Sequence, residues 1–205
     1  MGAPIELFGW QAGPEGFVRY GTSPNPVLSE WQDYLYLNAA GGRGSGKSTA
    51  GACRTLLYAL AWDGSLGIVT APTIQMLHDA TVPALMKVMH ESGLQPGDHY
   101  DYYALPRDEL VLKTGERETK IIFRPTEHPD RLRGQDAAFA WMDEPSYAVE
   151  KAFLNLQATL RQQGYPHQAW LTGTPRGRLH WTYQIFNDQM RPPGPGTYKL
   201  DMAPT

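Results

Sequence analysis

A glycine-rich run of eight residues constrains this chain more than any other feature of its sequence. The run is Gly41-Gly42-Arg43-Gly44-Ser45-Gly46-Lys47-Ser48. It fits the pattern G-x-x-x-x-G-K-S/T of a phosphate-binding P-loop. Such a loop directs backbone N–H groups toward one point at the positive end of a helix, and glycine is required where the backbone takes positive φ angles. The pattern therefore predicts a nucleotide phosphate site, to which we also assign Thr49.

The residues around the run support the same interpretation. A β-like segment (34–39) precedes it and a helix-like segment (48–62) follows it, as the strand–loop–helix context of a P-loop requires. Within the loop we expect Lys47 to reach the β- and γ-phosphates of a nucleotide and the Ser48 hydroxyl to bind Mg²⁺. The alternative is a glycine-rich turn that binds nothing.

Composition limits the class of protein. A chain of 205 residues with 41% hydrophobic residues can bury the core of one large domain. Its net charge of −3 excludes a broad basic field of the kind that a dedicated DNA-binding domain carries. The single cysteine, Cys53, excludes an internal disulfide and a cysteine-cluster zinc site. Because no apolar stretch approaches 18 residues, we expect a soluble protein with no membrane association, located in the cytoplasm.

From residue 34 onward, β-like and α-like segments alternate along the chain. This alternation predicts an α/β fold whose central sheet is open, mostly parallel and flanked by helices, with ligands at the carboxyl ends of the strands. The expected strands are 34–39, 66–70, 109–113, 120–124, 138–142, 168–172 and 197–202, and the expected helices are 48–62, 73–92 with a kink at Pro83, 149–163 and 181–190. We divide the chain into an irregular N-terminal arm (1–30), the P-loop core (31–190), and a Pro/Gly linker with a terminal strand (191–205).

Two adjacent acidic residues supply the carboxylates that a P-loop enzyme needs. Asp143 and Glu144 directly follow the apolar run 138–142, where a buried parallel strand would end. Asp143 suits the metal-binding role, and Glu144 suits a general base that polarises water for attack on the γ-phosphate. The alternative is a pair of solvated acids that begins a turn before Pro145.

Cationic side chains near these motifs are candidates for stabilising transition-state charge. Arg131 and Arg133 lie just before the Asp143 strand, where either would reach a nucleotide bound by an adjacent subunit, as an arginine finger does. Arg43 is a second candidate, acting within its own loop. The alternative for Arg133 is a surface pair with Asp130 or Asp136.

Two further segments fit the same pocket. Thr172, Gly173 and Thr174 end a predicted strand about 30 residues beyond Glu144, where the two threonine hydroxyls would sense the γ-phosphate or the attacking water. Gln32 precedes the P-loop, and its amide offers the acceptor and donors that adenine recognition needs. An ordinary turn and a surface glutamine are the respective alternatives.

Taken in order, these motifs resemble the ATPase domain of the terminase large subunit of tailed bacteriophages, the motor that packs viral DNA. The resemblance spans roughly residues 25–180. The residues that carry it are Gln32, Gly41 to Ser48, Arg131 to Gly134, Ala140 to Glu144, and Thr172 to Gly177.

The resemblance implies a RecA-like, additional-strand P-loop fold that uses ATP with Mg²⁺ to move double-stranded DNA into a procapsid in the host cytoplasm. It implies a homo-oligomeric ring, usually a pentamer, with the portal protein and the small terminase subunit as partners; a monomer is the alternative for the isolated chain. The implied roles are adenine binding for Gln32, phosphate and metal binding for Lys47 and Ser48, metal binding for Asp143, catalysis for Glu144, a trans-acting finger for Arg133 and coupling for Thr172 to Thr174.

The chain departs from the family pattern in one respect. Family members carry a C-terminal nuclease, whereas this sequence ends at Thr205, so we expect an isolated ATPase domain or a truncated product, without nuclease activity. Two rival functions remain open. The first is the first RecA-like lobe of a helicase, which requires the chain to be a fragment. The second is an assembly module that binds ATP without turnover. Glu144 argues against the module, because a site that only binds has no need of a general base.

Overall fold

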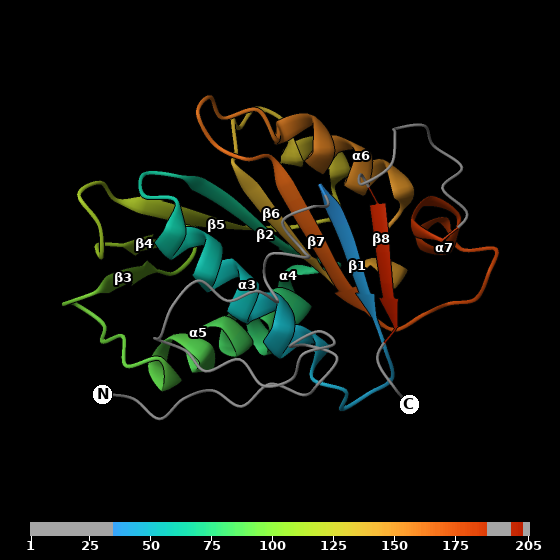
Figure 1. Cartoon of the computed structure of the whole chain (residues 1–205), viewed down its shortest axis with the longest axis horizontal. Helices are drawn as coiled ribbons and strands as arrows, with labels where there is room; N and C mark the ends of the chain where they lie inside the picture. Colours follow the sequence, from blue (N-terminus) through green and yellow to red (C-terminus); the bar gives the residue numbers. More distant parts are fainter. Residues whose placement is uncertain (1–34, 188–197, 203–205) are drawn as a thin grey trace.

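The computed structural model of the chain describes residues 35–187 and 198–202 (Figure 1). Within these residues, eight strands form one sheet in the order β3-β4-β5-β2-β6-β7-β1-β8. The strands are β1 (Tyr36–Ala40), β2 (Leu66–Ala71), β3 (Tyr100–Tyr103), β4 (Glu109–Leu112), β5 (Thr119–Pro125), β6 (Phe139–Asp143), β7 (Gln168–Gly173) and β8 (Tyr198–Met202). The six strands from β5 to β8 in this order are parallel, and β3 and β4 add an antiparallel edge. The predicted α/β class with a mostly parallel sheet is therefore confirmed.

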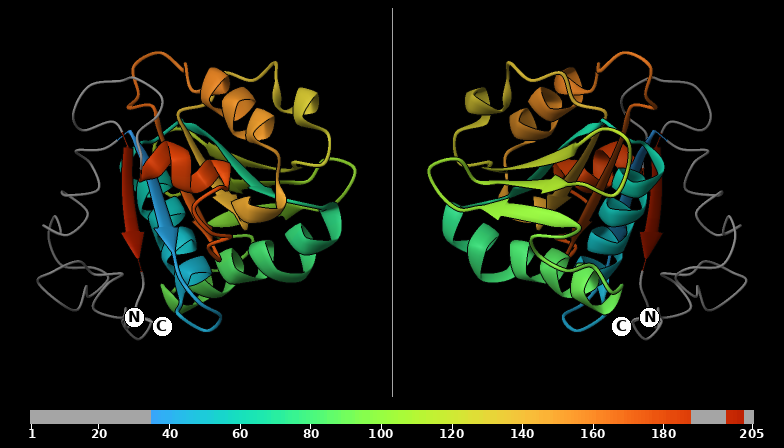
Figure 2. Two further views of the ribbon diagram at one scale, coloured as in Figure 1. Left: turned by 90° about the vertical axis from the view of Figure 1, so that its right-hand side faces the viewer. Right: turned by 90° about the vertical axis from the view of Figure 1, so that its left-hand side faces the viewer.

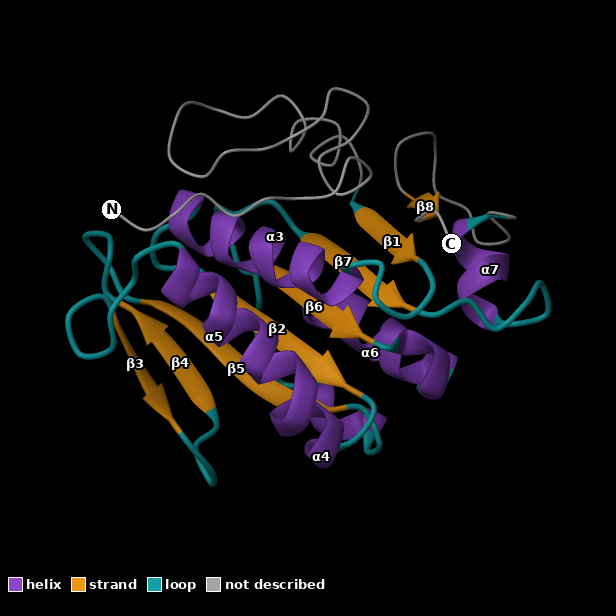
Figure 3. Ribbon diagram, turned by 90° about the horizontal axis from the view of Figure 1, so that it is seen from below, coloured by secondary structure: helices purple, strands orange, loops and turns teal. Residues whose placement is uncertain are grey.

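Helices cover both faces of the sheet. They are α3 (Lys47–Ala61), α4 (Ile74–Met76), α5 (Val82–Glu91), α6 (Glu150–Thr159) and α7 (Trp181–Phe186), with a π-helical turn η1 (Leu77–Thr81) and 3₁₀ turns η2 (Pro129–Leu132) and η3 (Pro145–Tyr147). Figures 2 and 3 show α3, α4 and α5 on one face, and α6 with α7 on the other. No described helix combines the length and apolarity that crossing a membrane requires.

Alternate residues of β6 divide the core between the two faces. Phe139 and Trp141 belong to the apolar cluster beneath α3 and α5, whereas Ala140 and Met142 belong to the cluster beneath α6 and α7. All four are fully buried, as expected for a central parallel strand. A Cβ atom added to Gly51 of α3 would lie 2.4 Å from Trp141 Nε1, so the glycine allows the helix to pack closely over the indole. This contact fixes the start of α3 above the end of β6.

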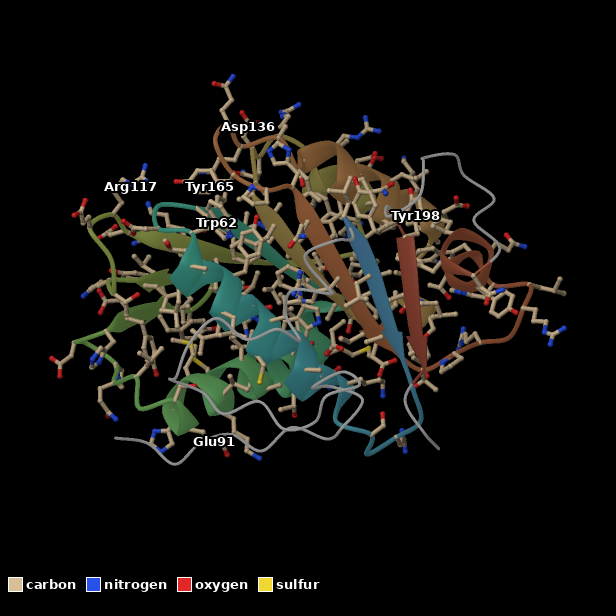
Figure 4. The ribbon with its side chains drawn as sticks, in the orientation of Figure 1. Trp62, Glu91, Arg117, Asp136, Tyr165 and Tyr198 are labelled. Atoms are coloured by element: carbon tan, nitrogen blue, oxygen red, sulfur yellow. The ribbon has the colours of Figure 1, made fainter. Side chains whose placement is uncertain are left out.

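The chain order of the parallel strands brings the loops of the site together. Ala40 of β1 pairs in register with Gly173 of β7, and Thr172 of β7 pairs with Asp143 of β6. The P-loop, the acidic pair and the predicted coupling segment therefore lie at one edge of the sheet, the carboxyl edge. Figure 4 shows Trp62, Tyr165 and Asp136 at the opposite edge, where the parallel strands begin.

The predicted terminal edge strand is present as β8. It pairs parallel to β1, and the ring of Tyr198 stacks on that of Tyr36 with centroids 5.1 Å apart (Figure 4). The predicted N-terminal arm and most of the Pro/Gly linker lie outside the described residues, so the domain boundaries remain predictions.

Three elements differ from the sequence prediction, each for a local reason. The helix expected at 73–92 is divided by the π-turn η1, which comes just before Pro83. The helix expected to reach 163 ends at Thr159, because the N–H groups of Arg161 and Gln162 bond to Ala137 O instead of continuing the helix. The hairpin formed by β4 and β5 gains a third strand, β3, from a tyrosine-rich segment that was not predicted as a strand.

Candidate active site

The P-loop has the local geometry that its glycines predict. Gly44 and Gly46 take left-handed φ angles of 77° and 79°. Ser45 Oγ donates a hydrogen bond to Gly42 O at 2.8 Å, which closes the loop on itself. Gly41 N donates to Gly173 O at 3.1 Å and so fastens the start of the loop to the end of β7. Glycine is needed at the two left-handed positions, because a residue with a side chain adopts such φ angles only at a cost in free energy.

The helix that follows begins without a side-chain cap. Gly46 occupies the N-cap of α3 and provides no side-chain cap, and the first turn of α3 contains no acidic residue. The first N–H groups of a helix lack partners within the helix, and their partial positive charge attracts phosphate. Lys47, only 6% exposed, begins this helix, and its Nζ lies 3.3 Å from Gly42 O.

Asp143 is a buried carboxylate that accepts hydrogen bonds from three hydroxyl groups. Its Oδ1 accepts from Thr172 Oγ1 at 2.7 Å and from Ser48 Oγ at 3.3 Å. Its Oδ2 accepts from Thr81 Oγ1 at 2.9 Å. The P-loop serine and the acid at the strand end are therefore in contact, although they belong to α3 and β6 and are separated by 95 positions in the sequence.

The surroundings of Asp143 disfavour its charge despite these bonds. Burial raises the pKa of the carboxyl and the neighbouring Glu144 carboxylate raises it further, against the opposing effect of the three hydroxyl donors. A nearby cation stabilises the ionised form of a buried acid and reverses such a shift. The site thus has the electrostatic character of one that is completed by positive charge.

Glu144 lies between the P-loop and the loop after β7. It is a non-glycine residue with a left-handed backbone (φ 47°, ψ 54°), a conformation that costs free energy and is concentrated at functional sites. Its Oε1 lies 3.5 Å from Lys47 Nζ, and its Oε2 accepts a 3.3 Å hydrogen bond from the backbone N–H of Thr174. The strained backbone turns the carboxylate back over the sheet edge, toward the lysine.

The predicted coupling segment contacts both carboxylates. Thr172 Oγ1 accepts a 2.7 Å bond from Trp141 Nε1 and donates to Asp143, while Thr174 N bonds Glu144. Gly173 lies between the two threonines in the sequence, and a Cβ atom added to it would lie 2.6 Å from Pro145 Cδ. The segment therefore packs directly against the turn that carries the two acids.

Thr81 was not singled out from the sequence, although it contacts Asp143 directly. It is 1% exposed and lies at the end of the π-turn η1. Sequence periodicity placed it in the middle of one long helix, and no motif marks it. The signal nearest to it in the sequence is Pro83, two residues later, for which a kink was predicted.

Three predicted site residues remain: Arg43, Arg133 and Gln32. Arg43 is exposed on the P-loop. Arg133 is also exposed, and its Nε and one terminal nitrogen donate to Asn155 Oδ1 of α6 at 3.0 and 2.9 Å. Its Nε lies 3.9 Å from Asp130, so the surface pairing considered as the alternative is present in the single chain. Gln32 lies outside the described residues.

A family model described as terminase large subunit, T4likevirus-type, N-terminal matches residues 38–202. The matched range covers most of the chain and contains the P-loop, both carboxylates and the coupling segment. The chain belongs to this family. No curated protein matches the sequence.

Solved structures of terminases share the fold. The large terminase of the thermophilic bacteriophage D6E in complex with ADP has a TM-score of 0.71 at 15% identity, over 86% of this chain and 43% of that chain. The large terminase ATPase domain of Thermus phage P74-26 has a TM-score of 0.57 at 20% identity, over 82% and 74% of the two chains. The HK97 bacteriophage large terminase has a TM-score of 0.61 at 12% identity, over 89% and 39%.

These similarities confirm the RecA-like fold of terminase ATPase domains that the motif resemblance implied. The identities are low, so they show the fold and not the activity. This terminase chain spans 39–43% of the length of the D6E structures it matches.

Proposed function

We propose that this chain is the ATP-hydrolysing domain of a viral DNA-packaging motor, which moves double-stranded DNA into a procapsid. The observation that carries the proposal is the arrangement of four side chains at the carboxyl edge of the sheet, beside the start of α3, which has no side-chain cap: Lys47, Ser48, Asp143 and Glu144. A phosphate-binding helix start beside a buried acid and a second, more accessible acid is the arrangement that P-loop hydrolysis requires.

Nucleotide binding involves the backbone N–H groups from Gly41 to Thr49, with Lys47 on the β- and γ-phosphates and Gln32 at the adenine. Mg²⁺ is the accompanying cation, and the donor set fits it because hydroxyl and carboxylate oxygens are its preferred protein ligands. Ser48 and Asp143 would hold it. When bound, the ion neutralises charge on the phosphate oxygens.

The ion pair of Lys47 with Glu144 gives the resting state of the site. When a γ-phosphate engages the Lys47 ammonium, Glu144 loses its cationic partner and becomes the stronger base. Its carboxylate then takes a proton from the attacking water while the Thr174 N–H holds Oε2 in place. Arginine completes the charge stabilisation, either Arg43 from the same chain or Arg133 from an adjacent subunit.

Coupling to movement follows from the contacts of Thr172 to Thr174. This segment touches both acids, and the backbone of Gly173 holds the first residue of the P-loop. A structural change at the γ-phosphate would therefore be transmitted to β7 directly, through these contacts. The motor works as a ring on the capsid, with the portal protein and the small terminase subunit as partners, in the cytoplasm of the host.

The test is ATP hydrolysis per subunit measured against protein concentration, with Lys47→Ala as the blank. Turnover that rises with concentration and collapses in Arg133→Ala supports an ATPase completed by its neighbour. The matched control is Arg161→Ala, because Arg161 is also exposed and paired with an aspartate, Asp136. Nucleotide binding without any turnover would favour the assembly module and contradict the proposal.

A further inference from the structure

The π-turn η1 interrupts a helix that is otherwise continuous from Ile74 to Glu91. Its defining bond runs from Val82 N to Leu77 O, five residues back. Pro83 follows at once, and a proline ring inside a helix collides with the carbonyl group four residues before it. Widening the preceding turn by one residue relieves that collision, and such π-turns are frequent at functional sites.

The widened turn delivers one hydroxyl group to the buried acid. Thr81 Oγ1 bonds Asp143 Oδ2 at 2.9 Å, whereas the bonds from Ser48 and Thr172 both go to Oδ1. Among the described residues, Thr81 is thus the side chain that holds Oδ2. Because Thr81 and Asp143 are 1% and 3% exposed, loss of this donor would leave a carboxylate oxygen buried without a compensating bond.

The other side of the same turn is fastened to the antiparallel edge of the sheet. His78 Nε2 lies 3.2 Å from Asp108 Oδ2, and the Asp108 side chain is 2% exposed. Asp108 has a left-handed backbone (φ 48°), and its carbonyl oxygen accepts a 3.0 Å bond from Phe123 N of β5. The turn is therefore braced from β5 on one side while it holds Asp143 on the other.

We propose that Thr81 is a positioning residue for Asp143, which it holds by Oδ2 so that Oδ1 stays directed toward Ser48 and the cation. The inference rests on the function proposed above. A hydrogen-bonding partner behind a metal-associated carboxylate fixes its orientation, and its loss costs about 10- to 100-fold in metal affinity. The expected effect is on the Mg²⁺ requirement, not on nucleotide affinity as such.

The experiment titrates Mg²⁺ while the protein binds a fluorescent, non-hydrolysable nucleotide, mant-labelled AMPPNP, and repeats the binding in EDTA. In Thr81→Val, the Mg²⁺ concentration at half-effect should rise by about tenfold or more, with binding in EDTA unchanged. Thr81→Ser retains the hydroxyl and should return the midpoint close to that of the wild type. Thr81→Ala is measured in parallel, since alanine places no methyl group against the carboxylate if the valine variant fails to fold.

The matched control is Thr159→Val. Thr159 is 2% exposed, and its hydroxyl bonds the Leu156 carbonyl at the end of α6, away from the carboxyl edge. The positioning role would be overturned if the Mg²⁺ midpoint stayed unchanged in Thr81→Val and Thr81→Ala, or if Thr159→Val shifted it equally. It would also be overturned if Thr81→Val lost nucleotide binding equally in EDTA and in Mg²⁺. A wild type whose nucleotide binding does not respond to Mg²⁺ would overturn the proposed function and this inference with it.

Discussion

Lys47 and Glu144 form an ion pair at the carboxyl edge of the sheet, with Nζ and Oε1 3.5 Å apart. One partner begins the helix after the P-loop, and the other follows the buried strand β6. The pair places the lysine and the proposed base in contact. Under the proposed function, ATP competes with Glu144 for the lysine, so nucleotide binding and activation of the base are one event.

Replacing the proposed base should separate binding from turnover. In Glu144→Gln the side chain keeps its size but cannot accept a proton, and turnover should fall by a factor of at least about 10². Nucleotide affinity should not weaken, because Lys47 no longer has a competing carboxylate. Phosphate release under saturating ATP measures the first quantity, and fluorescent ADP binding measures the second.

Glu116→Gln is the matched control for that variant, since Glu116 is exposed in the loop between β4 and β5. It should behave as the wild type in both assays. Normal turnover in Glu144→Gln would show that another group activates the water.

Removing the lysine should have the complementary effect. Lys47→Ala takes away the ammonium group that the phosphates need, so nucleotide affinity should fall and turnover with it. Calorimetric titration with ADP and with ATP would measure the loss, which should be larger for ATP because of the γ-phosphate. Equal affinity in wild type and variant would remove the assignment of this loop as the phosphate site.

The sequence was sufficient for the parts of the site that rest on local patterns. The P-loop pattern predicted a preceding strand, a following helix and glycines at positive φ angles, which Gly44 and Gly46 have. The position of Asp143 and Glu144 at a strand end was predicted from the apolar run before them. These succeed because adjacent residues determine them. The parallel sheet then joins them at the carboxyl edge, as strand–helix alternation predicts.

What the sequence missed depends on contacts between distant segments. Thr81 gains its role only because Pro83 widens a turn that faces Asp143, 62 positions away along the chain. The Lys47 pair with Glu144 likewise depends on a strained backbone angle at one glutamate, which no residue pattern encodes. For Arg133 the sequence allowed both a surface pair and a trans-acting role, and a single chain contains only the first.

Adding one methyl group at Gly173 should test how tightly the coupling segment is packed. In Gly173→Ala the new Cβ would lie 2.6 Å from Pro145 Cδ and 3.4 Å from the Glu144 backbone, so the acidic turn must shift. Overpacking of this kind costs about 1–3 kcal/mol of unfolding free energy. Urea denaturation should show that loss, and turnover should fall because Glu144 moves. Gly42→Ala is the stability control, because a Cβ there meets no atom within 4 Å; equal stability of the two variants would contradict the tight packing.

The buried carboxyl group of Asp108 should make stability depend on pH in acid solution. Burial raises its pKa, against the opposing effects of His78, Arg124 and the Tyr102 hydroxyl. Because the folded state then binds the proton more tightly than the unfolded chain does, the stability contributed by Asp108 is greatest below its ordinary pKa and is lost as pH rises through the raised value. Asparagine cannot titrate and tolerates the left-handed backbone.

The unfolding free energy of Asp108→Asn minus that of the wild type should therefore increase as the pH rises from below the ordinary aspartate pKa of about 3.9 to above it. Urea denaturation at steps of pH measures the difference directly. A difference that decreases over this range would mean that His78 and Arg124 outweigh burial and hold the pKa of Asp108 below its ordinary value. A flat difference would mean that the Asp108 carboxyl group has the same pKa in the folded and the unfolded chain. Its ionisation would then not change the unfolding free energy.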